Sequence, residues 1–298
     1  MTTIRPAGLE DLDAAVAMLN EHSQQLHGAD DVTPADLKQY WESPDVELGQ
    51  DILLAEESGS VVGYADIGLH GDHVWLDVRA TDDEALPELL LAIENVAAAK
   101  KPDAKLMGYT SADDSPLRDL FASSGYDLVR HSYRMRIELN GALPEPEWPE
   151  GVSVRTMHEG EERRFYDAHN AAFADTWLFH LEAFEVWRHW FVEDPSFDPS
   201  LWFVAEAGDD AAGIVIARKA EYEPGLGWVR ILGVVPEHRQ RGLGQALLRH
   251  TFGEFARRGL DAVGLGVDAE NPTGAVRVYE RAGMHVERTN LLFEKVQR

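Results

Sequence analysis

The chain has no cysteine, and its histidines follow no metal-binding pattern. The absence of cysteine excludes disulfide bonds, thiol nucleophiles and thiolate metal ligands. A metal would need histidine or carboxylate ligands, but the 12 histidines are scattered and form no His-Glu-x-x-His pair. We therefore predict that the protein has no metal site.

Long hydrophobic runs are also missing. No stretch approaches the roughly 18 to 20 apolar residues that span a bilayer. The first residues, MTTIRPAGLEDLD, lack a basic region followed by an apolar one. This pattern predicts a soluble, cytoplasmic protein.

Basic side chains are scarce, with 27 Lys and Arg against 53 Asp and Glu and a net charge of −26. Because contacts to phosphate need a basic surface, this charge argues against a nucleic acid or an anionic membrane as partner. Residues 1–150 hold 10 of the basic and 30 of the acidic groups, a net −20, which leaves −6 for residues 151–298. An anionic ligand is therefore expected in the second half, and the oligomeric state stays open.

The length and an internal repeat predict two domains. The chain has 298 residues, about twice the size of an ordinary domain. Residues 52–57 (ILLAEE) match 202–207 (WFVAEA), and 4–6 (IRP) match 154–156 (VRT), both at an offset of 150. A repeat of this period indicates two copies of one domain.

A segment rich in proline and glycine separates the two copies. The eleven residues from Gly141 to Gly151 include three prolines and two glycines, which disfavour both a helix and a central strand. We predict domains at 1–140 and 152–298, joined by a linker at 141–151.

Each half is predicted to be an α/β domain with a mixed sheet, in the order strand, helices, three strands, helix, strand, helix, strand. The predicted strands of the second half are 153–156, 201–207, 213–218, 228–235, 262–267 and 289–295. Its predicted helices include 159–173, 244–258 and 272–282, the last two ended by Gly259 and Gly283.

A glycine-rich loop before a helix is the most informative segment. Residues 232–245 (LGVVPEHRQRGLGQ) place a hydrophobic strand, a turn, a loop with Gly242 and Gly244, and a helix in that order. A helix N-terminus offers unpaired amides and a partial positive charge, and glycine lets an anion approach them. Residues 226–258 contain six Arg and two Glu, a local charge of +4 in an acidic chain. The segment predicts an anion-binding loop, and a turn that merely starts a helix is the alternative.

Two other nucleotide-binding loops fit poorly. A Walker loop needs Gly-Lys followed by Ser or Thr, and no Lys follows Gly242 or Gly244. A dinucleotide-binding fingerprint needs a third glycine at position 247, which is Leu247.

A second motif follows downstream. Asn271 before Pro272 predicts an N-cap with proline at the first helical position. Val276, Tyr279 and Gly283 then fall on one face of the predicted helix, where the Tyr279 hydroxyl could point out of the core. A core tyrosine whose hydroxyl is bonded to backbone is the alternative.

Together these motifs make residues 228–284 resemble the GNAT superfamily of N-acetyltransferases. The phosphate-loop motif of that family, Gln or Arg, two residues, Gly, one residue, Gly or Ala, is matched by Arg239, Gly242 and Gly244. Its downstream Asn and Tyr are matched by Asn271 and Tyr279. The order and the spacing of loop, Asn and Tyr carry the resemblance.

The resemblance implies a binding site for acetyl-coenzyme A (acetyl-CoA), used as a cosubstrate. The pantetheine arm would pair with the backbone of Leu232 to Val234, the diphosphate would lie on residues 239–245, and Tyr279 would protonate the leaving thiolate. Arg239 and Arg241 would add positive charge at the diphosphate. The implied cofactor-binding residues are Leu232, Gly233, Val234, Arg239, Gln240, Arg241, Gly242, Leu243, Gly244, Gln245 and Asn271.

The tandem arrangement resembles mycothiol synthase and related two-domain acetyltransferases, with one departure. Those enzymes tend to carry a Glu on the strand before the loop, placed to deprotonate the attacking amine, and the position that aligns here is Trp228. The general base is therefore open, and a base acting through water is one possibility. The candidate side chains are Asp175, His180, Glu182, Glu185, Glu221 and Glu223.

The first half lacks the loop. After the predicted strand 74–79, the sequence ATDDEALP has no glycine and three acidic residues, which would repel a diphosphate. Residues 1–140 are thus expected to be a degenerate copy, unless they bind a ligand of their own.

The expected reaction is direct transfer of an acetyl group to a small-molecule amine, with Tyr279 as general acid. A non-catalytic acyl-CoA sensor or structural protein is the alternative, and the acyl group could be longer than acetyl.

Overall fold

The computed structural model describes residues 2–271 and 273–297, which form two compact units. The first unit contains the chain up to His131 together with the residues from Thr289 on, and the second runs from Ser132 to Arg288. Each unit is a mixed sheet with helices on both faces. The predicted α/β class is confirmed.

The sheet of the first unit has the order β1-β2-β3-β4-β5-β12, with β4 and β5 parallel and the other neighbours antiparallel. Its strands are β1 (Thr3–Pro6), β2 (Ile52–Glu57), β3 (Ser60–His70), β4 (His73–Ala80), β5 (Lys105–Ser111) and β12 (His285–Val296). Its helices include α1 (Leu12–His27), α2 (Pro34–Trp41), α3 (Leu48–Asp51), α4 (Leu86–Lys100) and α5 (Ser115–Ser123).

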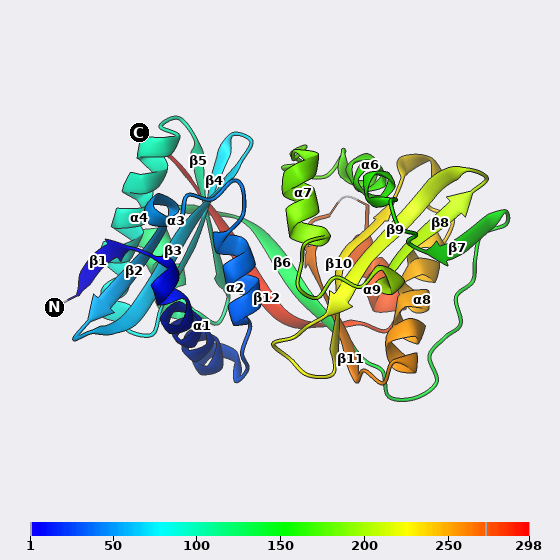
Figure 1. Ribbon diagram of the computed structural model, residues 1–298, viewed down its shortest axis with the longest axis horizontal. Coiled ribbons are helices and arrows are strands. Elements are labelled where there is room, and N and C mark those ends of the chain that lie inside the picture. The colour runs from blue at the N-terminus through cyan, green and yellow to red at the C-terminus, as the bar shows by residue number, and fades with distance from the viewer. Residues whose placement is uncertain (1, 272, 298) are drawn as a thin grey trace. The chain divides into compact units, whose positions relative to one another are not determined.

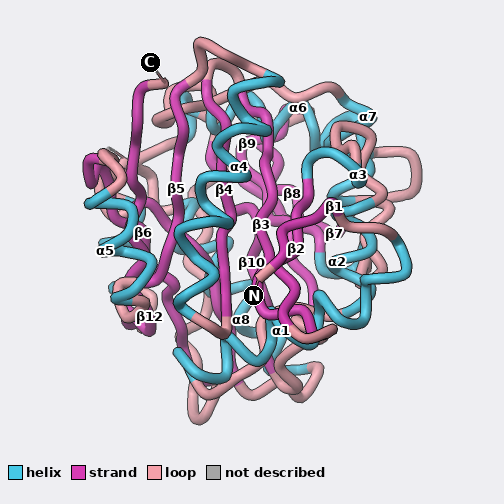
Figure 2. Tube along the Cα trace, turned by 90° about the vertical axis from the view of Figure 1, so that its left-hand side faces the viewer, coloured by secondary structure: helices cyan, strands magenta, loops and turns pink. Residues whose placement is uncertain are grey.

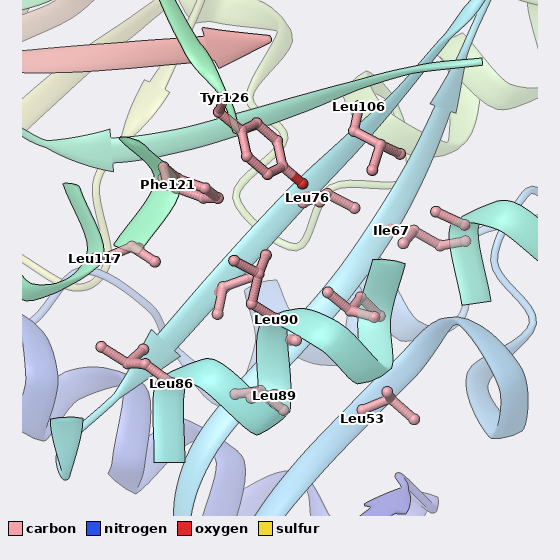
Figure 3. Packing of buried hydrophobic residues seen from close by; sticks show 14 of the residues in the cluster. Leu53, Ile67, Leu76, Leu86, Leu89, Leu90, Leu106, Leu117, Phe121 and Tyr126 are labelled. Carbon is pink, nitrogen blue, oxygen red and sulfur yellow. The ribbon is translucent and has the colours of Figure 1, made fainter. Parts of the chain in front are cut away.

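Two apolar clusters hold the helices to the faces of this sheet. Helix α4 lies along β3 and β4, as Figure 2 shows, and buries Leu89 and Ile93 against them. Figure 3 shows this cluster from close by, with Phe121 of α5 beside Tyr126. Helices α1 and α2 close the other face through a second cluster that includes Trp41.

The second unit repeats this plan with the sheet order β7-β8-β9-β10-β11-β6. Its strands are β6 (Asp127–Glu138), β7 (Val152–Thr156), β8 (Trp202–Ala207), β9 (Asp210–Lys219), β10 (Leu226–Val234) and β11 (Ala262–Asp268). Its helices include α6 (Glu162–Phe173), α7 (Phe184–Phe191), α8 (Leu243–Arg257) and α9 (Ala275–Arg281). One apolar cluster places α6 and α7 on one face of the sheet, and another places α8 and α9 on the opposite face (Figure 1).

An ion pair recurs at the offset of the sequence repeat. Arg5 on β1 donates to the carboxylate of Glu56 at 2.9 Å, and Arg155 on β7 donates to Glu206 at 2.9 Å. Each pair ties the first strand of its unit to the next strand. The repeated sequence therefore folds into repeated local structure.

The last strands are exchanged between the two halves of the sequence. Strand β6 comes from the first half but pairs with β11, Ala262 opposite Glu138. Strand β12 comes from the end of the chain but pairs with β5, Asn290 opposite Ser111. The compact units therefore differ from the predicted domains 1–140 and 152–298 at these two strands, while the assignment of separate roles to the two domains stays a prediction.

The predicted elements of the second half are found with boundaries shifted by at most four residues. Within the described part of the chain, none of the helices combines the length and the apolar character needed to cross a bilayer.

Candidate active site

Strand β10 separates from its parallel neighbour halfway along. The ladder between β10 and β11 runs from Leu226 opposite Ala262 to Val229 opposite Leu265 and then stops, although both strands continue. The register of β10 against β9 shifts at the same point, between Val229 and Ile231. A bulge of this kind bends a strand and increases its twist. Among the residues that the structure describes, one edge of the end of β10 therefore has no strand partner.

The Arg230 side chain, located at this bulge, is held by a buried carboxylate and two half-buried neighbours. Its Nη1 donates to Asp194 Oδ2 at 2.7 Å and to the Trp190 carbonyl at 2.6 Å, and its guanidinium lies 4.3 Å from the ring centre of Phe191. Asp194 also accepts from Arg218 at 3.0 Å. The sequence analysis missed this cluster because its members are 24 and 36 residues apart and follow no motif.

The strand register shows which backbone groups face the open edge. Val235 N–H donates to the Ala212 carbonyl at 3.1 Å across β9. Because antiparallel pairs alternate, Gly233 also bonds toward β9, whereas Leu232 and Val234 point their amides and carbonyls the other way. The Val234 carbonyl accepts from Arg239 Nε at 3.1 Å. Of the three predicted pantetheine contacts, Leu232 and Val234 thus face the open edge.

A tight loop leads from β10 into α8. Two of its residues adopt left-handed backbone angles, Gln240 with φ of 60° and Gly242 with φ of 83°. The first backbone bond of the helix runs from Ala246 N–H to the Gly242 carbonyl at 3.0 Å, so the amides of residues 243–245 precede it. No acceptor for the amides of residues 241–245 is found in the described part of the chain. The predicted anion-binding loop therefore has free donors.

The two loop positions, Gly242 and Gly244, are glycine for different physical reasons. Gly242 needs its left-handed conformation, which side chains rarely adopt. Gly244 has no such angle, and a Cβ there would meet only Val234 Cγ2 at an ordinary 3.6 Å. Since glycine near a helix start costs up to about 1 kcal/mol relative to alanine, neither packing nor backbone geometry accounts for Gly244. The predicted approach of an anion to these amides would account for it.

Arg239 and Arg241 differ in their surroundings. The Arg239 guanidinium donates to both carboxylate oxygens of Asp175, at 2.5 and 2.8 Å, and to the Ala172 carbonyl at 2.9 Å. The guanidinium of Arg239 lowers the pKa of Asp175 below its usual value, as expected for an ion pair. Arg241 is exposed. The charge predicted for the diphosphate is therefore neutralised at Arg239 and available at Arg241.

The prediction that Asn271 caps a helix starting at Pro272 is wrong for Asn271. Helix α9 begins at Ala275, after Gly274 with φ of 75°. The Asn271 side chain instead accepts from the Thr273 amide at 2.9 Å and from the Thr273 hydroxyl at 2.5 Å, which closes a local turn before the helix. Pro272 lies outside the described residues.

Tyr279 lies on α9, as predicted, and its side chain is 7% exposed. Burial raises its pKa to about 12, so the hydroxyl keeps its proton at neutral pH. Within residues 2–271 and 273–297 the hydroxyl has no hydrogen-bond partner, which argues against the alternative of a backbone-bonded core tyrosine.

The six candidates for a general base gain little support from the structure. Glu223 accepts from Arg134 at 2.9 Å and from Arg136 at 2.5 Å, and Asp175 is held by Arg239. Guanidinium groups of the chain therefore engage both carboxylates. The others are exposed or half-buried: His180, Glu182, Glu185 and Glu221.

A buried histidine near the site is an unsuitable base as well. His169 Nδ1 accepts from the indole of Trp187 at 2.9 Å, and burial lowers the His169 pKa to about 4. Its ring contacts Phe173, which lies against Gly233 of β10. Because an indole can only donate, the neutral His169 ring carries its proton on Nε2. The lone pair of Nδ1 already accepts the hydrogen bond of Trp187 and cannot take up a proton from an amine.

Strand β4 of the first unit also leaves its neighbour, since its ladder with β5 stops at Leu76 opposite Gly108. The helix that follows is preceded by a short turn in which the Asp82 carboxylate accepts from the Glu84 amide at 3.0 Å. A carboxylate of the chain itself thus accepts from an amide in front of this helix.

The tyrosine is also missing from the first unit. Gly125 follows α5 as Gly283 follows α9, and four residues before each glycine stand Phe121 and Tyr279. Phe121 is fully buried and packs on Phe293, so this position lacks a hydroxyl. Together with the Asp82 contact, these features support the interpretation of a degenerate copy.

Comparison with known proteins identifies the family. The model of the acetyltransferase (GNAT) family matches residues 162–284. Mycothiol acetyltransferase of Streptomyces coelicolor is 31% identical, over 95% of this chain and 91% of its own. Mycothiol acetyltransferase of Thermobispora bispora is 40% identical, but over only 55% of this chain and 57% of its own.

Solved structures share the fold. A GCN5-related N-acetyltransferase from Sphaerobacter thermophilus matches with a TM-score of 0.81 and 29% identity, over all of this chain and 96% of that one. A tandem GNAT protein from the clavulanic acid biosynthesis pathway matches with a TM-score of 0.76 at 14% identity, over all of this chain and 99% of that one. Because a relative that is 31% identical aligns over 95% of this chain, the chain belongs to the acetyltransferase (GNAT) family and is an acetyl-CoA-dependent acyltransferase.

Proposed function

We propose that the protein is an N-acetyltransferase that moves the acetyl group of acetyl-CoA to a small-molecule primary amine by direct attack. One observation carries the proposal: the unpaired amides at the start of α8 follow directly on the open edge of β10. A thioester cofactor with a diphosphate needs these two features side by side.

The chain offers partners for each part of the coenzyme. The Leu232 amide and carbonyl and the Val234 amide face the open edge, where an extended pantetheine arm can add like a strand. The diphosphate would accept from the amides of residues 241–245 at the positive end of α8, beside the charge of Arg241.

In the proposed reaction the amine nitrogen bonds to the acetyl carbon and the carbon–sulfur bond breaks. Amides at the end of β10 stabilise the carbonyl oxygen as it gains charge. Tyr279 donates its proton to the departing sulfur, and the amine releases a proton to water or to a base reached through water. The products are the acetylated amine and the free thiol of the coenzyme.

The acceptor is proposed only as a class. The relatives are named mycothiol acetyltransferase, which favours a small-molecule amine. Trp228 occupies the position where the resemblance places a Glu, and its ring lies 5.0 Å from the Arg134 guanidinium. The proposed acceptor is therefore a small-molecule primary amine, and the cytoplasmic location stays a prediction.

The experiment is a thiol-release assay with acetyl-CoA and a panel of primary amines, followed by mass spectrometry of the products. We expect at least one amine to release thiol faster than the amine-free control and to gain one acetyl group. Longer acyl donors tested in parallel determine whether acetyl is preferred. Coenzyme binding without acetylation of any amine would contradict the proposal.

A second candidate is a non-catalytic protein that binds acyl-CoA. Trp228 in place of an acid favours it, because no other side chain on β10 replaces that base. This candidate predicts that calorimetry detects coenzyme binding while thiol release stays at the background rate for every amine.

A further inference from the structure

Arg239 connects three segments of the second unit. Its Nε donates to the carbonyl of Val234 at the end of β10, and its Nη2 donates to the carbonyl of Ala172 in the last turn of α6. Both terminal nitrogens donate to Asp175, just after α6. The guanidinium also lies where a cation stabilises a helix C-terminus.

The end of α6 is itself fixed on β10. A Cβ at Gly233 would lie 2.8 Å from Ala172 Cβ and 3.1 Å from the Phe173 ring, so helix and strand are in close contact there. Arg239 is therefore braced against a rigid support rather than against a free loop. It directly precedes Gln240, which together with Gly242 is left-handed and turns the loop toward α8.

We propose that Asp175 is a positioning residue for the coenzyme loop. It holds Arg239 on the carbonyls of Ala172 and Val234, and this brace fixes the turn that presents the amides of residues 241–245. Arg239 is then a structural clamp rather than a ligand of the diphosphate, and Arg241 provides the positive charge. The inference rests on the proposed function and assigns roles to two residues of the same site.

The two possible roles of Arg239 predict opposite effects of one substitution. If Arg239 is a clamp, Asp175→Asn loosens the loop and weakens coenzyme binding. If Arg239 is a phosphate ligand that Asp175 holds back, Asp175→Asn frees it and strengthens binding. The sign of the change decides between them.

The test measures binding of coenzyme A to the full chain by calorimetry. Because the Asp175 side chain is 54% exposed, the pair has the strength of a surface ion pair, and we expect Asp175→Asn to raise Kd about 3- to 5-fold. Arg239→Gln, which also loses both carbonyl contacts, should raise Kd about 10-fold. The double variant Asp175→Asn with Arg239→Gln should bind coenzyme A no more weakly than Arg239→Gln alone, since both substitutions disrupt one clamp. Asp175→Glu, which keeps the carboxylate, should bind more tightly than Asp175→Asn.

Asp167→Asn is the matched control. Asp167 lies on α6 and pairs with Arg163 at 3.1 Å, and both side chains are more than 60% exposed. It has the same chemistry but does not contact the loop, so Kd should not change. Asp175→Asn and Asp167→Asn, which each lose only a surface ion pair, should keep the melting temperature of the wild type, and this separates an effect on the loop from unfolding.

Two results would overturn the proposal: tighter binding by Asp175→Asn, or effects of Asp175→Asn and Arg239→Gln that add. Failure of the proposed function has a different signature, because the wild type would then bind no coenzyme, or would bind it and acetylate no amine, and the second case leaves this binding test valid. In the first case, no binding by the wild type, hydrogen exchange without ligand still tests the clamp. Compared with the wild type, the amides of residues 241–245 should exchange about 3-fold faster or more in Asp175→Asn and at the same rate in Asp167→Asn. Equal rates in the two variants would refute the clamp.

Discussion

Replacing Tyr279 by Phe tests the proposed general acid with little disturbance of the fold. The hydroxyl has no partner within the described residues, so its removal breaks no hydrogen bond of the protein. We therefore expect the free energy of unfolding to change by no more than about 0.5 kcal/mol. Phe121 shows that the first unit accommodates phenylalanine at the corresponding position.

The pKa of Tyr279 sets the size of the catalytic effect. With a pKa of about 12, Tyr279 holds its proton more tightly than a thiol, whose pKa is about 8.5. Transfer of the proton to the sulfur is then uphill and occurs late, so the benefit in the transition state comes from the hydrogen bond to the developing negative charge. Such bonds contribute about 1.5 to 3 kcal/mol, which corresponds to a loss of roughly 10- to 100-fold in kcat.

The assay is thiol release at saturating acetyl-CoA, with Tyr126→Phe as control. The hydroxyl of Tyr126 donates to Glu94 at 2.8 Å, so the control should lose about 1 kcal/mol of stability and none of its kcat. The reasoning is refuted if Tyr279→Phe keeps the wild-type kcat, or if it loses as much stability as Tyr126→Phe.

Two further predictions concern the first unit and the exchanged strands. Burial and the opposite Asp77 raise the pKa of Asp66 to about 7, far above the value of about 4 in an unfolded chain. The folded state thus binds a proton that the unfolded state lacks between about pH 4 and 7, so stability should fall as pH rises through this window. Denaturant melts at pH 5 and pH 8 give the free energy of unfolding at each pH. The difference between the two values should be smaller for Asp66→Asn than for the wild type, and an equal difference would exclude this role. Fragment 152–298 lacks β6 and leaves the edge of β11 unpaired. It should therefore be less soluble and less protected from protease than fragment 132–288. Equal behaviour of the two fragments would contradict a stabilising role of the exchanged strand β6.

The sequence predicts the parts of the fold that depend on local patterns. The sequence predicts the helix 243–257 and the strand 262–268 almost at their observed limits, because apolar spacing marks both and Gly259 follows the helix. The left-handed Gly242 and the unpaired amides after it agree with the motif. These features need only neighbouring residues.

The remaining features depend on contacts between distant residues. The exchange of β6 and β12 is set by strand pairing, which leaves no trace in the composition of either strand. The partnership of Arg239 with Asp175, 64 residues away, is also invisible in the motif. At Asn271 the structure has a local turn instead of the predicted helix cap, because a side chain that can cap a helix can equally close a turn.

The central claim is that the free amides before α8 bind the diphosphate of the coenzyme. Calorimetry of coenzyme A with Gly244→Asp tests it most directly. Gly253→Asp on the same helix is the control, because a side chain fits at both positions: a Cβ meets nothing within 4 Å at Gly253 and only Val234 at Gly244. We predict that Gly244→Asp abolishes measurable binding, because it places a carboxylate among those amides, while Gly253→Asp keeps the wild-type affinity. Normal affinity of a folded Gly244→Asp variant would contradict the account.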